Sequence, residues 1–183
     1  VLFCDGRVGS AKEKPRVGAV CCLNDSFPGG KFLVFDWSSR LLRRVCHSSL
    51  TAEVHAACVA LDGIEDLRMT LRSIFGGRQN VILATDCLSL FTHLRRGKQI
   101  TEKALIKPIN TIADLISTHK LDNVVHIGGH FNPGDALTRA SPDTMKLLHS
   151  LMTSGTLPRL ETFGWLKQKG VTSSNMIENK GKT

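Results

Sequence analysis

Val81-Ile82-Leu83-Ala84-Thr85-Asp86 is an almost wholly apolar run that ends in an acid. A run of this length and composition predicts a central strand that is buried on both faces of a sheet. The chain opens on a second run of the same kind, Val1-Leu2-Phe3-Cys4-Asp5-Gly6. An acid at the end of a buried strand is costly to desolvate unless something there uses its charge. The two runs therefore indicate the framework of the fold and the place of its chemistry.

The other elements follow from hydrophobic periodicity and from turn residues around these two runs. Strands are expected at residues 1–5, 17–23, 31–37, 81–85 and 123–127. Helices are expected at about 49–71, 88–97, 109–116 and 141–155. This order predicts an α/β fold with a five-stranded mixed sheet. Its first three strands are antiparallel, the last two run parallel to the first, and helices cover both faces.

Capping residues mark the ends of several helices. Ser48 or the serine after it can cap the first helix. Pro108 either opens the third helix or kinks a longer one. Ser141 with Pro142 starts the last helix, and Gly155 can end it.

Four acids stand at the ends of these elements, namely Asp5, Glu53, Asp86 and Asp135. Ligands of open α/β sheets gather at the carboxyl ends of parallel strands, so all four acids can meet at one edge. Converging acids repel, and a divalent cation is the usual remedy. Four oxygen donors without a soft ligand suit Mg²⁺ or Mn²⁺, and two such ions about 4 Å apart can catalyse phosphodiester hydrolysis. Asp5 is expected to bridge the two ions because its strand is the most central.

The net charge of the chain is +8, from 24 Lys and Arg against 16 Asp and Glu. This balance indicates a polyanionic partner, most simply a nucleic acid. The alternative is a basic surface that only confers solubility. Aromatic residues make up 5 % of the chain and tyrosine is absent, so recognition by base stacking is poorly supported. Trp37 is accordingly expected to be packed rather than stacked on bases.

A chain of 183 residues fits one domain with an appendage. The domain is expected at residues 1–160, followed by a polar, Lys-rich tail at 161–183 that another protein could hold. Because the chain begins with Val1 directly on a strand, a processed or partial chain is expected. The six cysteines show no Cys-x-x-Cys spacing and are expected to be buried free thiols in a reducing, intracellular compartment. No run reaches membrane-spanning length, so no membrane partner is expected.

Four segments stand in a characteristic order: Trp37-Ser38-Ser39, Ser48-Ser49-Leu50-Thr51-Ala52-Glu53-Val54-His55-Ala56, Ala84-Thr85-Asp86-Cys87-Leu88-Ser89-Leu90 and Asn132-Pro133-Gly134-Asp135-Ala136-Leu137-Thr138-Arg139. Together they resemble the ribonuclease H domain of LTR retroelements, especially the Ty1/copia group, over roughly residues 1–160. The last segment is similar to the family's closing pattern Asn-x-Ala-Asp-x-Leu-Thr-Lys/Arg. The resemblance implies a ribonuclease H fold, a two-metal site and cleavage of RNA in an RNA–DNA hybrid. It also implies the metal ligands Asp5, Glu53, Asp86 and Asp135.

Three positions depart from the family's pattern without removing a ligand. Cys87 stands where Ser usually follows the third acid, Gly134 where Ala is common, and His126 where an aromatic residue often ends the last strand. His130 lies five residues before Asp135, and some ribonucleases H use a mobile histidine near the last acid to help product release or proton transfer. The favoured interpretation of His130 is a solvent-facing loop residue.

Gly6 and two groups of basic residues are candidate contacts to nucleic acid. The backbone at Gly6 could approach a ribose 2′-OH, which only RNA presents, or Gly6 is simply a strand-end glycine. Basic loops of related enzymes grip the hybrid, which is the function expected of Arg40, Arg43, Arg44, Arg95, Arg96 and Lys98. The alternative for these six residues is a solvated run of charge.

The leading hypothesis is a metal-dependent endoribonuclease of retroelement origin that cuts the RNA strand of hybrids. A second hypothesis is a recruited module that serves as a structural or RNA-binding part of a larger ribonucleoprotein, without activity and with structured RNA as its partner. A third is another nuclease of the same superfold, such as an integrase, a resolvase or an exonuclease. The segment 132–139 argues against an integrase, whose last acid is generally a Glu on a helix.

Overall fold

Six strands form one mixed sheet in the order β3-β2-β1-β4-β5-β6. The computed structural model describes residues 1–10, 13–43, 46–96, 101–139, 141–157 and 162–165. The strands are β1 (Leu2–Arg7), β2 (Arg16–Ser26), β3 (Gly29–Leu41), β4 (Ile82–Thr85), β5 (Asn123–Ile127) and β6 (Thr162–Trp165). The first three pair antiparallel, and β4 and β5 run parallel to β1. The predicted five-stranded arrangement is confirmed, and β6 extends it as an antiparallel neighbour of β5.

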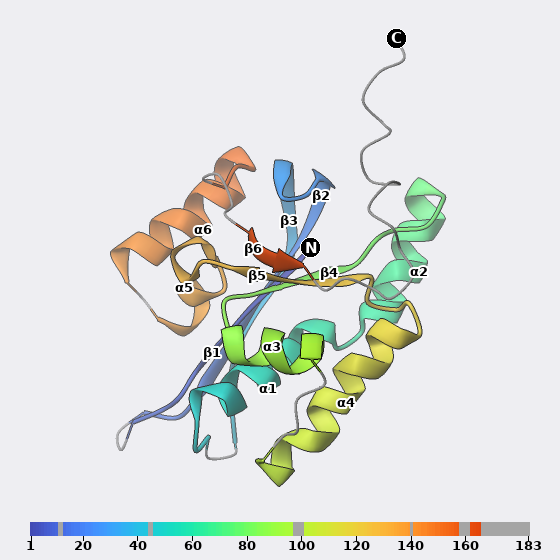
Figure 1. Ribbon diagram of the computed structural model, residues 1–183. Helices are drawn as coiled ribbons and strands as arrows, with labels where there is room; N and C mark the ends of the chain where they lie inside the picture. The colour runs from blue at the N-terminus through green and yellow to red at the C-terminus, as the bar shows by residue number, and fades with distance from the viewer. Residues whose placement is uncertain (11–12, 44–45, 97–100, 140, 158–161, 166–183) are drawn as a thin grey trace.

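Helices cover both faces of this sheet (Figure 1). They are α1 (Ser49–Leu61), α2 (Ile64–Phe75), α3 (Leu88–Arg96), α4 (Lys103–Ser117), the 3₁₀ turn η1 (Gly129–Phe131), α5 (Asp135–Thr138) and α6 (Pro142–Ser154). Helices α1, α3 and α4 pack on one face, and α5 and α6 on the other. Successive residues of β1 enter different cores, since Leu2 and Cys4 pack with the first set of helices and Phe3 packs on the α6 side. Burial on both faces is what the apolar composition of β1 and β4 predicts.

One predicted helix is wrong in its extent. The segment expected to be continuous over about 49–71 is two helices, because Gly63 between them adopts a left-handed conformation with φ of 72°. Helix α1 packs on the sheet, whereas α2 buries little beyond Ile64 and exposes Met69 and Phe75. The apolar stripe thus continues in sequence but not along one axis.

The capping predictions are confirmed. The side chain of Ser48 accepts a hydrogen bond from the Thr51 backbone N–H at 3.1 Å, and Ser141 caps α6 in the same way. Gly155 ends α6 with a left-handed φ of 65°. Pro108 lies inside α4, so the second of its two predicted positions is correct.

Two further expectations concern the edges of the sheet. Trp37 was expected to be packed, and this is wrong, because its side chain on the edge strand β3 is 55 % exposed. Strand β6 falls within the segment expected to be a tail, so the sheet extends to Trp165. Residues 166–183 lie outside the described residues.

The six cysteines are free thiols, three of them buried and three half-buried. Within the described ranges, every helix is too short or too polar to cross a bilayer.

Candidate metal centre

The carboxyl ends of β1 and β4 place Asp5 and Asp86 next to each other. These neighbouring parallel strands pair Cys4 with Thr85, so each acid is one residue beyond the same rung of the sheet. Glu53 reaches the same point from α1. One carboxylate oxygen from each of these three acids lies within 4.8 Å of the other two. The predicted meeting of acids at one edge of the sheet is therefore realised for Asp5, Glu53 and Asp86.

Glu53 reaches the strand edge because α1 lies directly on the backbone of β1. A Cβ atom at Gly6 would come within 2.2 Å of the Ala52 carbonyl carbon and 2.5 Å of the Glu53 nitrogen. Only glycine leaves the space for this contact. Gly6 thus has a structural function in positioning Glu53, and its contact with a ribose stays a prediction.

The fourth acid, Asp135, approaches from the opposite face as the first residue of α5. Its carboxylate interacts with that of Asp5 and lies 3.8 Å from the Arg139 Nε. Two glycines permit this approach. A Cβ atom at Gly18 on β2 would lie 2.8 Å from both the Gly134 oxygen and the Leu137 Cβ, and one at Gly134 would lie 3.1 Å from the Asp5 nitrogen. Asp135 therefore adjoins the three-acid cluster through a close helix–strand contact.

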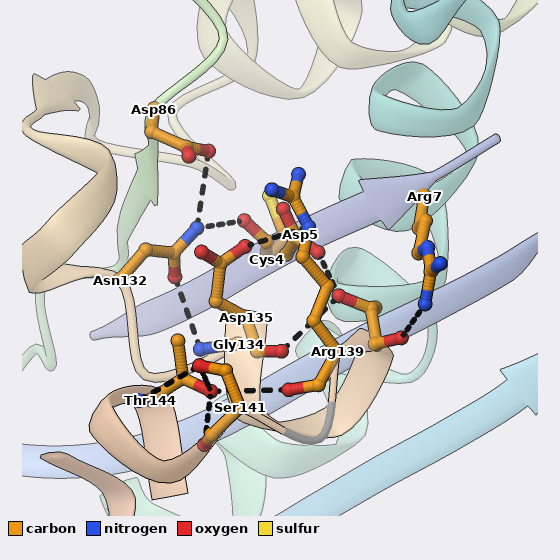
Figure 2. Close-up of polar contacts among 11 residues, drawn as sticks. Cys4, Asp5, Arg7, Asp86, Asn132, Gly134, Asp135, Arg139, Ser141 and Thr144 are labelled. Carbon is orange, nitrogen blue, oxygen red and sulfur yellow. Dashed lines mark hydrogen bonds and ion pairs between the residues drawn. The ribbon is translucent and has the colours of Figure 1, made fainter.

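A buried asparagine links the two central strands to the loop before α5. The Asn132 amide donates to the Cys4 carbonyl at 2.8 Å and to Asp86 Oδ1 at 3.1 Å, and its oxygen accepts from the Gly134 N–H. Figure 2 shows the Asn132 amide between Asp86 and the backbone of Cys4. His126 adds a contact from its Nε2 to the Asp86 carbonyl at 3.1 Å. These contacts hold Asp86 next to the backbone of β1.

Burial and mutual repulsion raise the pKa of three of the acids. Desolvation is the largest cause for Glu53, and the charges of Asp5 and Asp86 add to it, so that its pKa rises to about 9. Burial and the neighbouring Asp5 raise the pKa of Asp135 to about 7, although Arg139 opposes the shift. The pKa of Asp86 is also raised, first by burial and then by Asp5. Carboxylates held in this way repel one another until a cation neutralises them.

The free oxygen atoms of the acids fit a hard divalent cation. Asp5 Oδ1, Glu53 Oε2 and Asp135 Oδ1 are buried and accept no hydrogen bond from the described residues, and Asp135 Oδ1 lies 3.8 Å from the Arg139 Nε. Oxygens on opposite sides of one Mg²⁺ are about 4.2 Å apart, because each Mg–O bond is about 2.1 Å. The 4.8 Å spread of the cluster is close to that value. A donor set of carboxylate oxygens at this spacing is typical of a site for a hard divalent cation.

Two of the departures from the family pattern have structural explanations. The Cys87 sulfur accepts a hydrogen bond from the Leu90 N–H at 3.4 Å, so the thiol takes the capping position at the start of α3 that a Ser would fill. Burial raises the pKa of this thiol to about 11. The His126 ring packs against Phe91, with 5.8 Å between ring centroids, as an aromatic residue would.

The other predicted residues lie around the acids rather than among them. His130 is exposed and stacks on Phe131, in the turn whose first residue, Gly129, adjoins Asp86. Arg40 is exposed in the same row of the sheet as Gly6, two strands and thus about 10 Å away. Arg95 and Arg96 are exposed at the far end of α3, roughly 13 Å along the helix from Asp86.

Arg43 is also exposed. Arg44 and Lys98 lie outside the described residues.

Three residues that contact the acids have no function predicted from the sequence, namely Asn132, Thr138 and Arg139. All three belong to the closing segment around Asp135. Thr138 and Arg139 follow Asp135 by three and four positions, which places them on the same side of any helical turn. That spacing was the available signal. The contact of Asn132 with Asp86 depends on tertiary structure and has no local signal.

The sheet order, the helices on its two faces and the acids at its edge define a ribonuclease H-like fold. No protein-family model and no curated protein matches the chain. Among solved structures, ribonuclease H1 LC11, isolated from compost by a metagenomic approach, matches with a TM-score of 0.56 and 19 % identity, over 79 % of this chain and 96 % of that one.

The same enzyme in complex with an RNA/DNA hybrid matches with a TM-score of 0.55 and 19 % identity, over 79 % of this chain and 97 % of that one. Ribonuclease H1 from the halophilic archaeon Halobacterium salinarum matches with a TM-score of 0.55 and 20 % identity, over 78 % and 96 %. At this level of identity the likeness establishes the fold.

Proposed function

We propose that the protein is a metal-dependent endoribonuclease that cleaves the RNA strand of RNA–DNA hybrids. The observation that carries the proposal is the cluster of Asp5, Glu53 and Asp86, whose oxygens lie within 4.8 Å of one another at the edge of a ribonuclease H-like sheet. Two of its buried oxygens have no partner in the protein. Such an arrangement is unfavourable for the protein alone and becomes favourable with bound cations.

Asp5, Glu53, Asp86 and Asp135 would hold two Mg²⁺ or Mn²⁺ ions. Bound there, the ions would activate a water molecule and stabilise the leaving 3′ oxygen, as two-metal sites do in phosphodiester hydrolysis. Asp5 is the central ligand, because it lies between Glu53 on one face and Asp135 on the other. Asn132 holds Asp86 through its amide, and the buried surroundings of the acids keep bulk water from competing for the ions.

Basic residues around the acids would bind the phosphate backbone of the substrate. Arg40, Arg43, Arg95 and Arg96 are exposed, and the whole chain carries a net charge of +8. Contacts of this kind make affinity fall steeply with salt. The complex of the LC11 ribonuclease H1 with an RNA/DNA hybrid supports the choice of substrate. The retroelement origin rests on the four sequence segments described above.

The test is hydrolysis of an end-labelled RNA–DNA hybrid with Mg²⁺, beside single-stranded RNA and duplex DNA. Internal cuts in the RNA strand that disappear with EDTA and with Asp86→Asn support the proposal. Lys146→Ala on α6 is a control that should leave cleavage unchanged. Its amine is exposed and lies 3.8 Å from the carboxylate of exposed Asp143 on the same helix. A ladder that shortens from one end indicates an exonuclease. Tight binding of hybrid or structured RNA without any cleavage would instead favour the recruited, inactive module.

A further inference from the structure

Thr138 is a buried residue with no predicted function. Its hydroxyl contacts the carboxylate of Asp5 and the backbone carbonyl of Asp135. This residue lies three residues after Asp135, on the side of α5 that faces β1, and it is 6 % exposed. Its Oγ1 hydrogen-bonds to Asp5 Oδ2 and lies 3.3 Å from the Asp135 backbone carbonyl. The side chain therefore joins the central acid of the cluster to the helix that carries the fourth acid.

A threonine hydroxyl has one hydrogen to donate, and here two acceptors compete for it. The ionised Asp5 carboxylate is the stronger acceptor, because hydrogen bonds to charged groups are roughly twice as strong as those between neutral groups. The hydroxyl therefore donates to Asp5 Oδ2. The other oxygen of Asp5, Oδ1, is the one without a protein partner. The two oxygens of Asp5 are thus different: one is occupied by Thr138 and one is free for a cation.

We infer that Thr138 is a positioning residue that fixes the rotation of the Asp5 carboxylate so that Oδ1 faces the cations. This inference rests on the proposed function. Without the hydroxyl, the Asp5 carboxylate could turn about its last bond, and both oxygens would sample the site. Loss of a residue that orients a metal ligand in this way typically lowers metal affinity by about 10–100-fold.

The methyl group of Thr138 explains why the hydroxyl points in one direction. Its Cγ2 would lie 3.2 Å from a Cβ atom at Gly18, so the methyl packs on the bare backbone of β2. A β-branched side chain held on one branch has little freedom at χ1. Helix α5 also has anchors that do not involve this side chain, since Ser39 Oγ donates to the Leu137 carbonyl at 2.8 Å and Arg7 donates to the Thr138 carbonyl at 3.5 Å. Removing the hydroxyl should therefore leave α5 in place.

Two substitutions separate the hydroxyl from the methyl. Thr138→Val keeps the shape and removes the donor, and Thr138→Ser keeps the donor. Thr153→Val is the matched control, because the Thr153 hydroxyl donates to the His149 carbonyl at 2.7 Å on the exposed side of α6. Three quantities are measured for each variant. They are the affinity for Mg²⁺ and Mn²⁺ by calorimetry, the melting temperature of the metal-free protein, and the cleavage rate as a function of Mg²⁺ concentration.

The expected result is about tenfold weaker metal binding in Thr138→Val, with recovery of most affinity in Thr138→Ser. The metal-free Thr138→Val protein should melt at a lower temperature than Thr153→Val, because Asp5 Oδ2 is left buried without a donor, whereas Thr138→Ser should melt close to the wild type. The cleavage rate of Thr138→Val should recover at high Mg²⁺ with KM for the hybrid unchanged. Wild-type affinity in Thr138→Val would overturn the inference and leave the proposed function intact. Equal losses of affinity and melting temperature in both Thr138 variants would also overturn it, because they indicate a purely structural function. A wild-type protein that binds neither cation would overturn both the inference and the proposed function.

Discussion

The two sides of the acid cluster are built in different ways. Asp5, Glu53 and Asp86 stand on the two central strands and on a 13-residue helix, all anchored in the main cores. Asp135 stands on a four-residue helix that is held by side-chain contacts from β1 and β3 and by the bare backbone at Gly18. The first side is fixed by the fold as a whole, and the second by a few local contacts. Substitutions should therefore affect the two sides by different amounts.

The largest difference should appear in catalysis. Asp5→Asn is expected to lower the cleavage rate by on the order of 10³-fold or more, because Asp5 belongs to the close trio of acids. Asp135→Asn is expected to lower it by about 10–100-fold, because Asp135 lies outside that trio and is paired with Arg139. Single-turnover cleavage of a labelled hybrid at saturating Mg²⁺ measures both rates. Equal losses would mean that the four acids act as one unit and that the comparison fails.

The next difference concerns stability. Gly6→Ala should lower the free energy of unfolding by more than about 3 kcal/mol, because the new Cβ would lie 2.2 Å from the backbone of α1. Gly18→Ala should lower it by about 1–3 kcal/mol, since α5 can move away from β2 more easily than α1 can move from β1. Urea unfolding measures both values. Gly29→Ala is the control, because its Cβ would meet only the Ser26 oxygen, at 3.6 Å.

The pH dependence of stability should separate the two sides in the metal-free protein. Because the folded-state pKa values of Glu53 and Asp135 are raised, to about 9 and about 7, their protonated forms favour the fold. That stabilisation is complete below about pH 4. It is lost as pH rises, by about pH 7 for Asp135 and by about pH 9 for Glu53.

Thermal melts in EDTA between pH 4 and pH 9 measure this loss. Glu53→Gln should reduce the fall in melting temperature over the whole range up to pH 9. Asp135→Asn should reduce that fall only below about pH 7. Adding Mg²⁺ should restore stability most at high pH, where the acids are ionised. A protein that becomes more stable from pH 5 to pH 9 in EDTA would contradict the raised pKa values.

The smallest effect is expected at an anchor of α5. Ser39→Ala removes the donor to the Leu137 carbonyl and should lower the free energy of unfolding by about 0.5–1 kcal/mol, since the bond is exposed. The cleavage rate should fall a few-fold through Asp135, and that fall should vanish in an Asp135→Asn background. Ser38→Ala, on the other face of β3, provides the control. A rate loss that persists without Asp135 would show that Ser39 acts elsewhere.

The sequence is enough to predict that Asp5, Glu53 and Asp86 meet at one edge of the sheet, but it does not predict the contacts that position Asp135. The apolar runs that end at Asp5 and Asp86 predict parallel central strands, and the Ser48 cap predicts where the helix carrying Glu53 begins. These signals are local, and the sheet joins them in a way that strand parallelism requires. The break at Gly63 was missed, because a glycine within a periodic pattern can either continue a helix or end it.

The contacts that hold α5 have no comparable local signal. Ser39 belongs to the recognisable segment Trp37-Ser38-Ser39, but its hydrogen bond to the Leu137 carbonyl joins residues 98 positions apart and cannot be predicted from that segment. The same holds for Asn132, whose amide reaches Cys4 across 128 positions. The exposure of Trp37 was also not predictable, since an aromatic residue on a strand carries no mark of whether that strand lies at an edge.

Gly134 lets the start of α5 lie directly against the backbone of β1. Helix α5 lies so close to β1 that a Cβ atom at Gly134 would lie 3.1 Å from the Asp5 nitrogen and 3.2 Å from the Cys4 carbonyl carbon. Both neighbours are backbone atoms of the central strand β1. An alanine here would require α5 and β1 to move apart by a few tenths of an ångström. The residue at position 134 therefore sets how closely the fourth acid can approach Asp5.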